Sequence, residues 1–332
     1  MNVHYISALL AVVVLGFLAY LGTEVLGLQS LFGIFIPYLA VCVFIVGAIM
    51  KVMNWAKSPV PFRIPTTCGQ GKSLDWIAQN KIDNPSSTVG VVVRMFFEVL
   101  LFRSLFRNTK AGIKEGKITY EWEIFLWVGA LAFHYSFLTV LVRHMRFFLE
   151  PVPYCIKIVE TLDGFFQVGL PGVLLSGVVL LAAVLFLLAR RVVMPQISYI
   201  SLMADYFPLF LIIGIAGTGL YMRYFARVDV VAIKELTMGL VTFKASVPAG
   251  VNSIVFVHLF FVSVLFAYFP FSKLMHAGGI FLSPTRNMAS NNRMVRHVNP
   301  WNPELKFHTY AAYEDDFREK MIEAGLPVDK EA

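Results

Sequence analysis

Four of the seven histidines in the chain fall in or beside two apolar stretches long enough to cross a lipid bilayer. His134 and His144 lie in the segment Phe133–Arg146, while His258 and His276 lie in and just beyond a second stretch near the C-terminus. Imidazole is uncommon and costly inside a membrane, so each of these side chains is a candidate for function. A lone membrane histidine commonly makes only a helix–helix hydrogen bond, but two on each of two helices favour metal ligation.

Haem is the metal group that suits these residues best. Its iron accepts imidazole ligands, and its macrocycle is a large apolar plate that fits inside a helix bundle. Cys42, Cys68 and Cys155 are isolated from one another, with no CxxC or CxxCH motif. This excludes an iron–sulfur ferredoxin motif, a zinc ribbon and a covalently attached c-type haem. We therefore expect two b-type haems, each held by two histidines.

The elements that must position these histidines are membrane-spanning helices. Hydrophobic residues make up 58% of the chain and charged residues 15%, against roughly 25% charged residues in a soluble domain. Six apolar stretches approach the ~20 residues that a spanning helix needs. They are Ile6–Leu26, Leu31–Val52, Ile124–Phe148, Phe165–Leu188, Tyr206–Tyr221 and Val251–Phe271. The chain is therefore predicted to be an all-α integral membrane protein whose six transmembrane helices form a haem-binding bundle.

The distribution of positive charge predicts the orientation of the bundle. Six spans place both termini on one side of the membrane, together with the loop 51–122, the segment 189–204 and the tail after residue 272. That side carries 21 of the 28 Lys and Arg residues. Because Lys and Arg concentrate on the cytoplasmic side, we expect a multi-pass protein of the cell membrane with both termini cytoplasmic.

The spacing of the histidines predicts how they pair. His134 and His144 are ten residues apart, about 15 Å along a helix axis, whereas His258 and His276 are eighteen apart, about five turns of one continuous helix. Their helices run in opposite directions, so His144 pairs with His258 near the outer surface and His134 with His276 nearer the cytoplasm. The two spacings differ by about 12 Å of helix rise, which a bend at Pro270 has to absorb.

Charged side chains near the outer pair are further candidates. Arg143 and Arg146 are expected to bind haem propionates, because guanidinium binds carboxylate through two hydrogen bonds. The alternative is that both are ordinary helix-end arginines whose heads reach the surface. Glu150, Lys157 and Asp163 are candidates for a quinol site, where protons released from a quinol need acceptors.

The remaining parts of the chain divide it into four predicted segments. They are an N-terminal transmembrane hairpin (1–53), a cytoplasmic loop (54–122), a four-helix dihaem domain (123–276) and a cytoplasmic tail (277–332). The loop contains an amphipathic helix over Thr88–Arg107 that is expected to lie on the membrane surface. The charged stretch Tyr313–Lys320 predicts a short exposed helix in the tail. Loop and tail are suited to docking a soluble protein, and nothing in the chain indicates nucleic acid.

Several segments give the chain a resemblance to a known family. Histidine pairs ten and eighteen residues apart, on the first and last of four consecutive spans, resemble the cytochrome b (gamma) subunit of respiratory nitrate reductase. Closer still, five segments are similar to the DsrM family, the membrane cytochrome b subunits of the sulfite-reduction-associated DsrMKJOP complex. They are PTTCGQGKSLDW (65–76), FHYSFLTVLVRHMRFF (133–148), DYFPLFLIIGIAGTGLYMRYF (205–225), FPFSKLMHAGGIFLSPTRN (269–287) and RHVNPWNPELKFHTYAAYEDDFREKM (296–321).

The resemblance implies a menaquinone-linked dihaem subunit whose axial ligands are His134, His144, His258 and His276. It also implies electron exchange between the menaquinone pool and a cytoplasmic iron–sulfur subunit of the heterodisulfide-reductase type (DsrK-like). Further implied partners are a second membrane subunit and periplasmic subunits that carry c-type haems and iron–sulfur clusters. Sulfur metabolism is the implied setting.

Two other functions stay open at this point. A transporter or channel could use the histidines as a proton relay, although the chain shows no internal repeat and no carboxylate in the middle of a span. A gamma-type subunit of a different respiratory complex would carry the same histidines.

Overall fold

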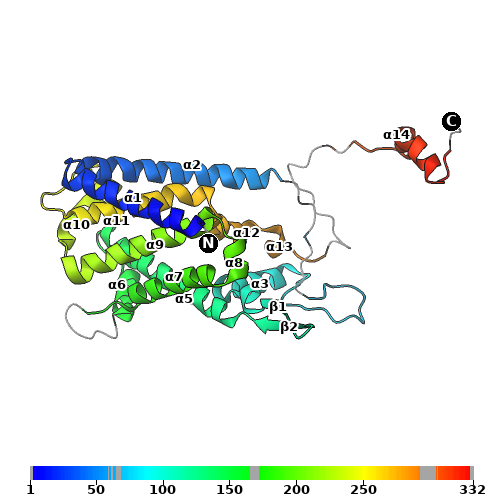
Figure 1. The fold of residues 1–332 in the computed structure, drawn as a ribbon, viewed down its shortest axis with the longest axis horizontal. Coiled ribbons are helices and arrows are strands. Elements are labelled where there is room, and N and C mark those ends of the chain that lie inside the picture. Colours follow the sequence, from blue (N-terminus) through cyan, green and yellow to red (C-terminus); the bar gives the residue numbers. More distant parts are fainter. Residues whose placement is uncertain are drawn as a thin grey trace.

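The structure is a computed structural model that describes residues 3–58, 60, 63–64, 69–164, 172–291, 304 and 306–329. Within these ranges, six helical segments are long and apolar enough to cross a membrane. They are His4–Glu24 (α1), Leu31–Ala56 (with α2, Ile36–Ala56), Ile124–Phe147 (with α5, Ile124–His144), Leu175–Val193 (α7), Met203–Ala226 (with α9, Met203–Tyr221) and Ser253–Phe271 (with α11, Ser253–Tyr268). The predicted all-α membrane fold is therefore confirmed, and Figure 1 shows the long helices side by side.

The bounds of one span differ from the prediction. The sequence places the fourth span at Phe165–Leu188, but α7 begins at Leu175 and continues to Val193. The first residues of the predicted span, 165–171, lie outside the described part of the chain. Arg190 and Arg191 thus belong to the last turn of α7, where positive charge interacts favourably with the C-terminal end of the helix dipole.

A cluster of buried apolar side chains lies where α1, α7, α9 and α11 meet. Its members include Val12, Ala19, Val184, Leu211, Phe256 and Phe261. Large apolar side chains also cover the outside of the bundle, as Phe17 and Leu39 show with 59% and 63% of their surface exposed. Lipid tails are as apolar as these side chains, so the outward-facing residues fit a bilayer and not water.

The two ends of the bundle carry different short elements. Helices α6 (Tyr154–Asp163) and α10 (Val230–Val241) lie at one end, which we call the α6 end. Helix α3 (Thr88–Leu101), a β-hairpin of β1 (Thr109–Lys114) and β2 (Lys117–Trp122), α12 (His276–Leu282) and α13 (Pro284–Asn287) lie at the other, the α3 end (Figure 1). The sequence predicts neither α6 nor α10. Asp229 starts α10, because its Oδ1 accepts hydrogen bonds from the backbone N–H groups of Val231 at 2.8 Å and Ala232 at 3.3 Å.

The segment predicted as one interfacial helix, Thr88–Arg107, folds as two. They are α3 (Thr88–Leu101) and α4 (Arg103–Phe106). Phe102 separates them in the left-handed conformation, with φ at 49°. Along α3, the side chains of Val89, Val92 and Phe96 form an exposed apolar stripe. Such a stripe fits a helix that lies on a membrane surface.

A β-hairpin, which is not among the elements predicted from the sequence, follows α4. Strand β1 (Thr109–Lys114) pairs antiparallel with β2 (Lys117–Trp122). Glu115 and Gly116 form the two-residue turn with φ values of 52° and 75°, since a tight hairpin turn of this kind needs positive φ at both positions. Glycine adopts such a φ readily, so Gly116 favours the turn.

A buried carboxylate orders the loop that precedes α3. Asp83 accepts a hydrogen bond from Arg103 Nε at 2.7 Å and also binds Arg107. Burial acts to raise the pKa of Asp83, but the hydrogen bond from Arg103 and the charges of Arg103 and Arg107 together lower it below its ordinary value. The bond to Asp83 in turn raises the pKa of Arg103. Asp83 therefore ties the loop to α4 as an anion.

The segment after α11 packs on the same loop. It contains α12 (His276–Leu282) and α13 (Pro284–Asn287). Arg286 forms an ion pair with Glu98 of α3 at 3.2 Å, and the backbone N–H of Ser290 donates to the carbonyl of Pro85 at 2.7 Å. The loop and the start of the tail thus form one unit at the α3 end. The exposed helix predicted in the tail is present as α14 (Tyr310–Glu323), which lies apart from the bundle in Figure 1.

Candidate functional site

The structure brings the four membrane histidines together as two facing pairs. His144, the last residue of α5, faces His258 of α11, with ring centres 6.4 Å apart and ring planes 18° apart. His134 of α5 faces His276, the first residue of α12, with ring centres 6.0 Å apart and planes 84° apart. These are the pairs that the spacing predicts. We call them the 144/258 pair and the 134/276 pair.

The separation within each pair is the one that a shared metal requires. A histidine nitrogen lies about 2.0–2.1 Å from a bound metal such as zinc and about 1.1 Å from the centre of its own ring. Two imidazoles on opposite sides of one metal therefore have ring centres about 6.3 Å apart. The observed 6.4 Å and 6.0 Å agree with this value. Among the described residues, no group of three or more His, Cys, Asp or Glu side chains is placed to hold a metal, so each pair stands alone.

The hydrogen bonds of the imidazoles leave the metal-binding nitrogen available. In three of the four histidines, Nδ1 lies close to a backbone carbonyl oxygen of the same helical segment. The distance is 2.8 Å from His134 to Ala130, 2.7 Å from His144 to Val140 and 2.8 Å from His276 to Lys273. A carbonyl only accepts, so Nδ1 donates its proton and Nε2 keeps its lone pair. A backbone or side-chain acceptor on the second nitrogen is the usual arrangement of a metal-ligating histidine. His258 differs only in its acceptor, which is the hydroxyl of Thr218 at 2.9 Å.

A break after α11 places His276 opposite His134. At Pro270, where the sequence suggests a bend, the helix is fully broken: α11 ends at Tyr268, and two short 3₁₀ turns lead to α12. Ser272 between the turns has an extended backbone, with φ −117° and ψ 176°, and its Oγ accepts from the backbone N–H of Leu274. Pro270 opens this segment, where it cannot donate the hydrogen bond that would continue an α-helix. The break removes the mismatch between the two histidine spacings.

Close packing against α2 holds the break in place. A Cβ on Gly47 of α2 would lie 2.8 Å from Cβ of the buried Pro270, closer than any normal contact. We expect Gly47→Val to cost about 1–3 kcal/mol through overpacking and to displace the segment that leads to His276. Thermal unfolding of the purified protein in detergent measures this. The control is Val46→Leu, at a neighbouring position that is 51% exposed, and it should leave the midpoint of thermal unfolding unchanged. Equal unfolding midpoints for the two variants would contradict close packing at Gly47.

A buried ion pair lies beside the 144/258 pair. Arg143 binds Asp163 of α6 at 2.6 Å and Ser176 of α7 at 3.1 Å. Asp163 also accepts from the backbone N–H and the hydroxyl of Ser176, both at 2.7 Å. Nη1 of Arg143 is thus satisfied, but its Nε is buried without a hydrogen-bond partner in the protein. Arg143 therefore keeps one donor for a further acceptor.

The other charged candidates at the α6 end have separate partners. Arg146 binds Glu160 and lies over the ring of Phe147, and Glu150 binds Lys234 of α10. Arg146 and Glu160 are both about one third exposed, so this pair is at the surface. Asp163 is committed to Arg143. The structure therefore does not gather the predicted quinol-site residues into one cavity.

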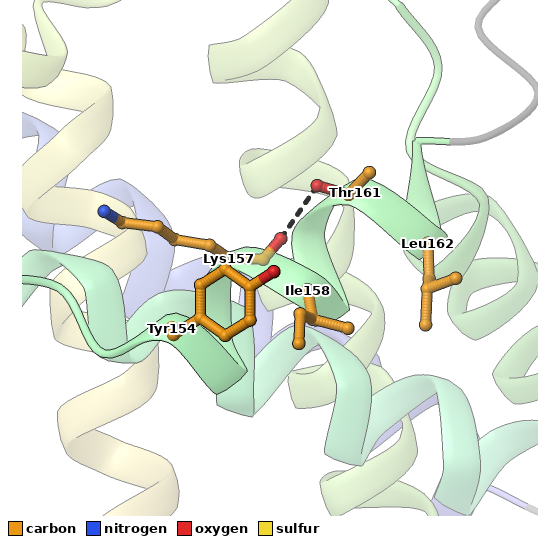
Figure 2. Close-up of a pocket in the computed structure, with 5 residues that line it drawn as sticks. All are labelled: Tyr154, Lys157, Ile158, Thr161 and Leu162. Carbon is orange, nitrogen blue, oxygen red and sulfur yellow. Dashed lines mark hydrogen bonds between the residues drawn. The ribbon is translucent and has the colours of Figure 1, made fainter.

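Lys157 lies on an exposed stripe of α6. With Tyr154, Ile158, Thr161 and Leu162 it lines a shallow depression of about 200 Å³ (Figure 2). Tyr154 and Leu162 are 77% and 69% exposed. The hydroxyl of Thr161 donates to the Lys157 carbonyl at 2.9 Å and so faces its own helix. The stripe offers an apolar surface with one cationic side chain at its edge.

Two residues that the sequence does not single out belong to this region. Thr218 contacts His258 across 40 positions of sequence, and Ser176 completes the Arg143 ion pair. Both are ordinary small polar residues in apolar stretches, so no local pattern distinguishes them. Elsewhere, His308 lies at the surface with Asp316 at 3.2 Å.

Comparison with known proteins adds an independent finding. Residues 95–297 match the family model described as nitrate reductase gamma subunit. The chain is 43% identical over 280 residues to the Hdr-like menaquinol oxidoreductase cytochrome b-like subunit of Archaeoglobus fulgidus, a match that covers 82% of this chain and 84% of that protein. It is 42% identical over 281 residues to the protein of the same name from Archaeoglobus profundus, covering 81% and 83%. With all four paired histidines inside the matched region, the chain belongs to the nitrate reductase gamma subunit family.

Proposed function

We propose that the chain is a membrane-bound dihaem cytochrome b subunit that carries electrons between the menaquinone pool and a cytoplasmic iron–sulfur subunit. The observation that supports this most is the pair of facing imidazole sets, each at the separation of two ligands on one metal. When bound, haem supplies one-electron chemistry, and its potential depends on axial ligands and their surroundings. His144 and His258 would hold one haem, and His134 and His276 the other.

The protein supplies more than the four ligands in this proposal. Arg143 is held by Asp163 and has a buried, unused Nε, which fits a haem propionate as acceptor. Arg146 is the second propionate candidate, at the surface with Glu160. His134 and His276 are exposed in the protein alone, so the space beside them is open to a large apolar group.

The α6 end faces the outside of the cell and receives the quinol in this proposal. The names of the two relatives describe menaquinol oxidoreductases, which supports menaquinol as the electron donor. The exposed stripe of α6 offers Tyr154, Ile158 and Leu162 to an apolar quinone tail, with Lys157 beside them. Glu150 and Asp163 lie at this end, bound to Lys234 and Arg143, and are the carboxylates proposed to interact with released protons.

The α3 end, with both termini, faces the cytoplasm. The excess of Lys and Arg on this side supports that orientation. The loop and the tail at this end are proposed to bind a heterodisulfide-reductase-like (DsrK-like) iron–sulfur subunit. A second membrane subunit and periplasmic subunits with c-type haems and iron–sulfur clusters would complete a DsrMKJOP-type complex of sulfur metabolism. The word Hdr-like in the names of both relatives supports the first of these partners.

Quinol-driven reduction tests the proposal. Membranes that contain the chain are mixed with a short-chain menaquinol analogue, and the b-type haem absorbance is followed. We expect reduction by the quinol to reach a large fraction of the level given by dithionite. Haem that dithionite reduces and menaquinol does not would contradict the quinone link, and a protein without b-type haem would contradict the cytochrome itself.

A further inference from the structure

His258 is the only one of the four paired histidines whose Nδ1 hydrogen bond is made to a side chain. For the other three, the acceptor is a carbonyl three or four residues earlier in the same helical segment. For His258 it is the hydroxyl of Thr218, on the neighbouring helix α9, at 2.9 Å, and the backbone carbonyl of Ile215 on the same helix is a second acceptor near this ring. A side-chain acceptor can be removed by substitution, whereas a backbone carbonyl cannot.

The hydrogen bonds of Thr218 define the direction of this contact. Its Oγ lies 2.7 Å from the carbonyl of Gly214 and 3.1 Å from that of Ile215, and both of these oxygens only accept. The single hydroxyl proton is therefore used within α9, and the lone pairs of Oγ accept from His258. Nδ1 of His258 carries the proton, and its Nε2 is directed to the 144/258 site.

Helix α9 is shaped to bring this hydroxyl to the ring. Gly219 follows Thr218, and a Cβ there would lie 3.4 Å from Cε1 of His258. A Cβ at this distance makes an ordinary van der Waals contact, so α9 packs directly on the imidazole at the turn that carries the Thr218 hydroxyl. The contact fixes both the tautomer and the plane of the ring, which lies 18° from that of His144.

We propose that Thr218 is a positioning residue for His258 and lowers the reduction potential of the haem bound by the 144/258 pair. This inference rests on the proposed function. A hydrogen-bond acceptor on Nδ1–H draws the proton partly away from the imidazole and makes Nε2 more basic. A more basic ligand stabilises ferric over ferrous iron, so the reduction potential falls. Loss of the acceptor therefore raises the potential at this site and leaves the 134/276 site unchanged.

Potentiometric titration of the b-type absorbance in purified Thr218→Val tests the inference, because valine has the shape of threonine without its hydroxyl. We expect one of the two redox transitions to move to a more positive potential, namely the one missing in His258→Ala. Thr218→Ser keeps the hydroxyl and should titrate like the wild type. The control is Thr139→Val, which removes a hydroxyl that donates only to the Tyr135 carbonyl of its own helix.

Two results would overturn the role of Thr218. One is a Thr218→Val protein whose transitions match the wild type, and the other is a Thr218→Ser protein shifted as far as Thr218→Val. If the valine variant loses the haem, Thr218→Ser and Thr218→Ala are compared. Haem retained only with serine supports the role, and equal behaviour of the two overturns it.

A readout without haem separates this inference from the proposed function. Nitrogen-15 shifts of His258 in cofactor-free protein report which ring nitrogen carries the proton. We expect Nδ1–H in the wild type and a smaller fraction of Nδ1–H in Thr218→Val, where the Ile215 carbonyl is the remaining acceptor. The same fraction in the wild type would overturn the contact, whatever the protein binds.

Discussion

Replacing His258 with alanine is expected to lower the b-type haem content of the purified protein by about half. His258 faces His144 across 6.4 Å, and alanine leaves that iron with one protein ligand. The 134/276 pair uses different side chains and lies towards the α3 end, whereas His144 lies at the α6 end, so the haem of the 134/276 pair should remain. The measurement is haem per protein from the reduced-minus-oxidised spectrum.

The control for this substitution is His308→Ala. His308 is more than half exposed and pairs with Asp316 in the region of α14, far along the chain from both pairs. It should keep the full haem content. Equal loss of both haems in His258→Ala, in a protein that still migrates as a single folded species, would contradict the assignment of separate pairs.

Replacing Asp163 with asparagine is expected to have the largest effect on stability. Asp163 and Arg143 retain only 4% and 13% of their side-chain exposure, and Ser176 satisfies the remaining oxygens of the carboxylate. Removing one partner of a buried ion pair leaves the other charge uncompensated, which costs about 3–5 kcal/mol. Unfolding of the purified protein by a denaturing detergent measures the loss.

Glu160→Gln provides the matched control, because Glu160 lies on the same helix and pairs with an arginine from the same segment. Its pair with Arg146 is about one third exposed, and an exposed pair contributes about 0–1 kcal/mol. The Arg143→Met and Asp163→Leu double variant removes both buried charges and should recover much of the stability lost in Asp163→Asn. Similar costs for Asp163→Asn and Glu160→Gln would show that burial of the first pair does not matter.

The sequence predicts the histidine pairs because two simple quantities control them. Helical rise places His134 and His144 about 15 Å apart along α5, and the antiparallel course of α11 lets His258 face His144. The route to His276 depends on the extended backbone at Ser272 and on the contact between Pro270 and Gly47. A bend at Pro270 is readable from the sequence, but its geometry is set by packing between distant helices.

The polar partners of the site are less predictable than the ligands. Charge and position identify Arg143 and Asp163 as neighbours of His144, but not as one ion pair closed by Ser176. Thr218 has no local signal, because its contact with His258 exists only once α9 and α11 pack together. Similarly, the hairpin of β1 and β2 lies in a short charged segment before the third span, and Gly116 alone marks its turn.

Low-temperature electron paramagnetic resonance of the oxidised protein tests the central claim most directly. The angle between two axial imidazole planes controls the splitting of the iron d orbitals, so near-parallel rings give a rhombic low-spin signal and near-perpendicular rings a highly anisotropic one. The 144/258 planes are 18° apart and the 134/276 planes 84° apart. We predict one signal of each kind, with the rhombic signal absent in His258→Ala and the anisotropic signal absent in His276→Ala. A spectrum without low-spin ferric haem, or one in which each substitution removes both signals, would contradict two separate bis-histidine sites.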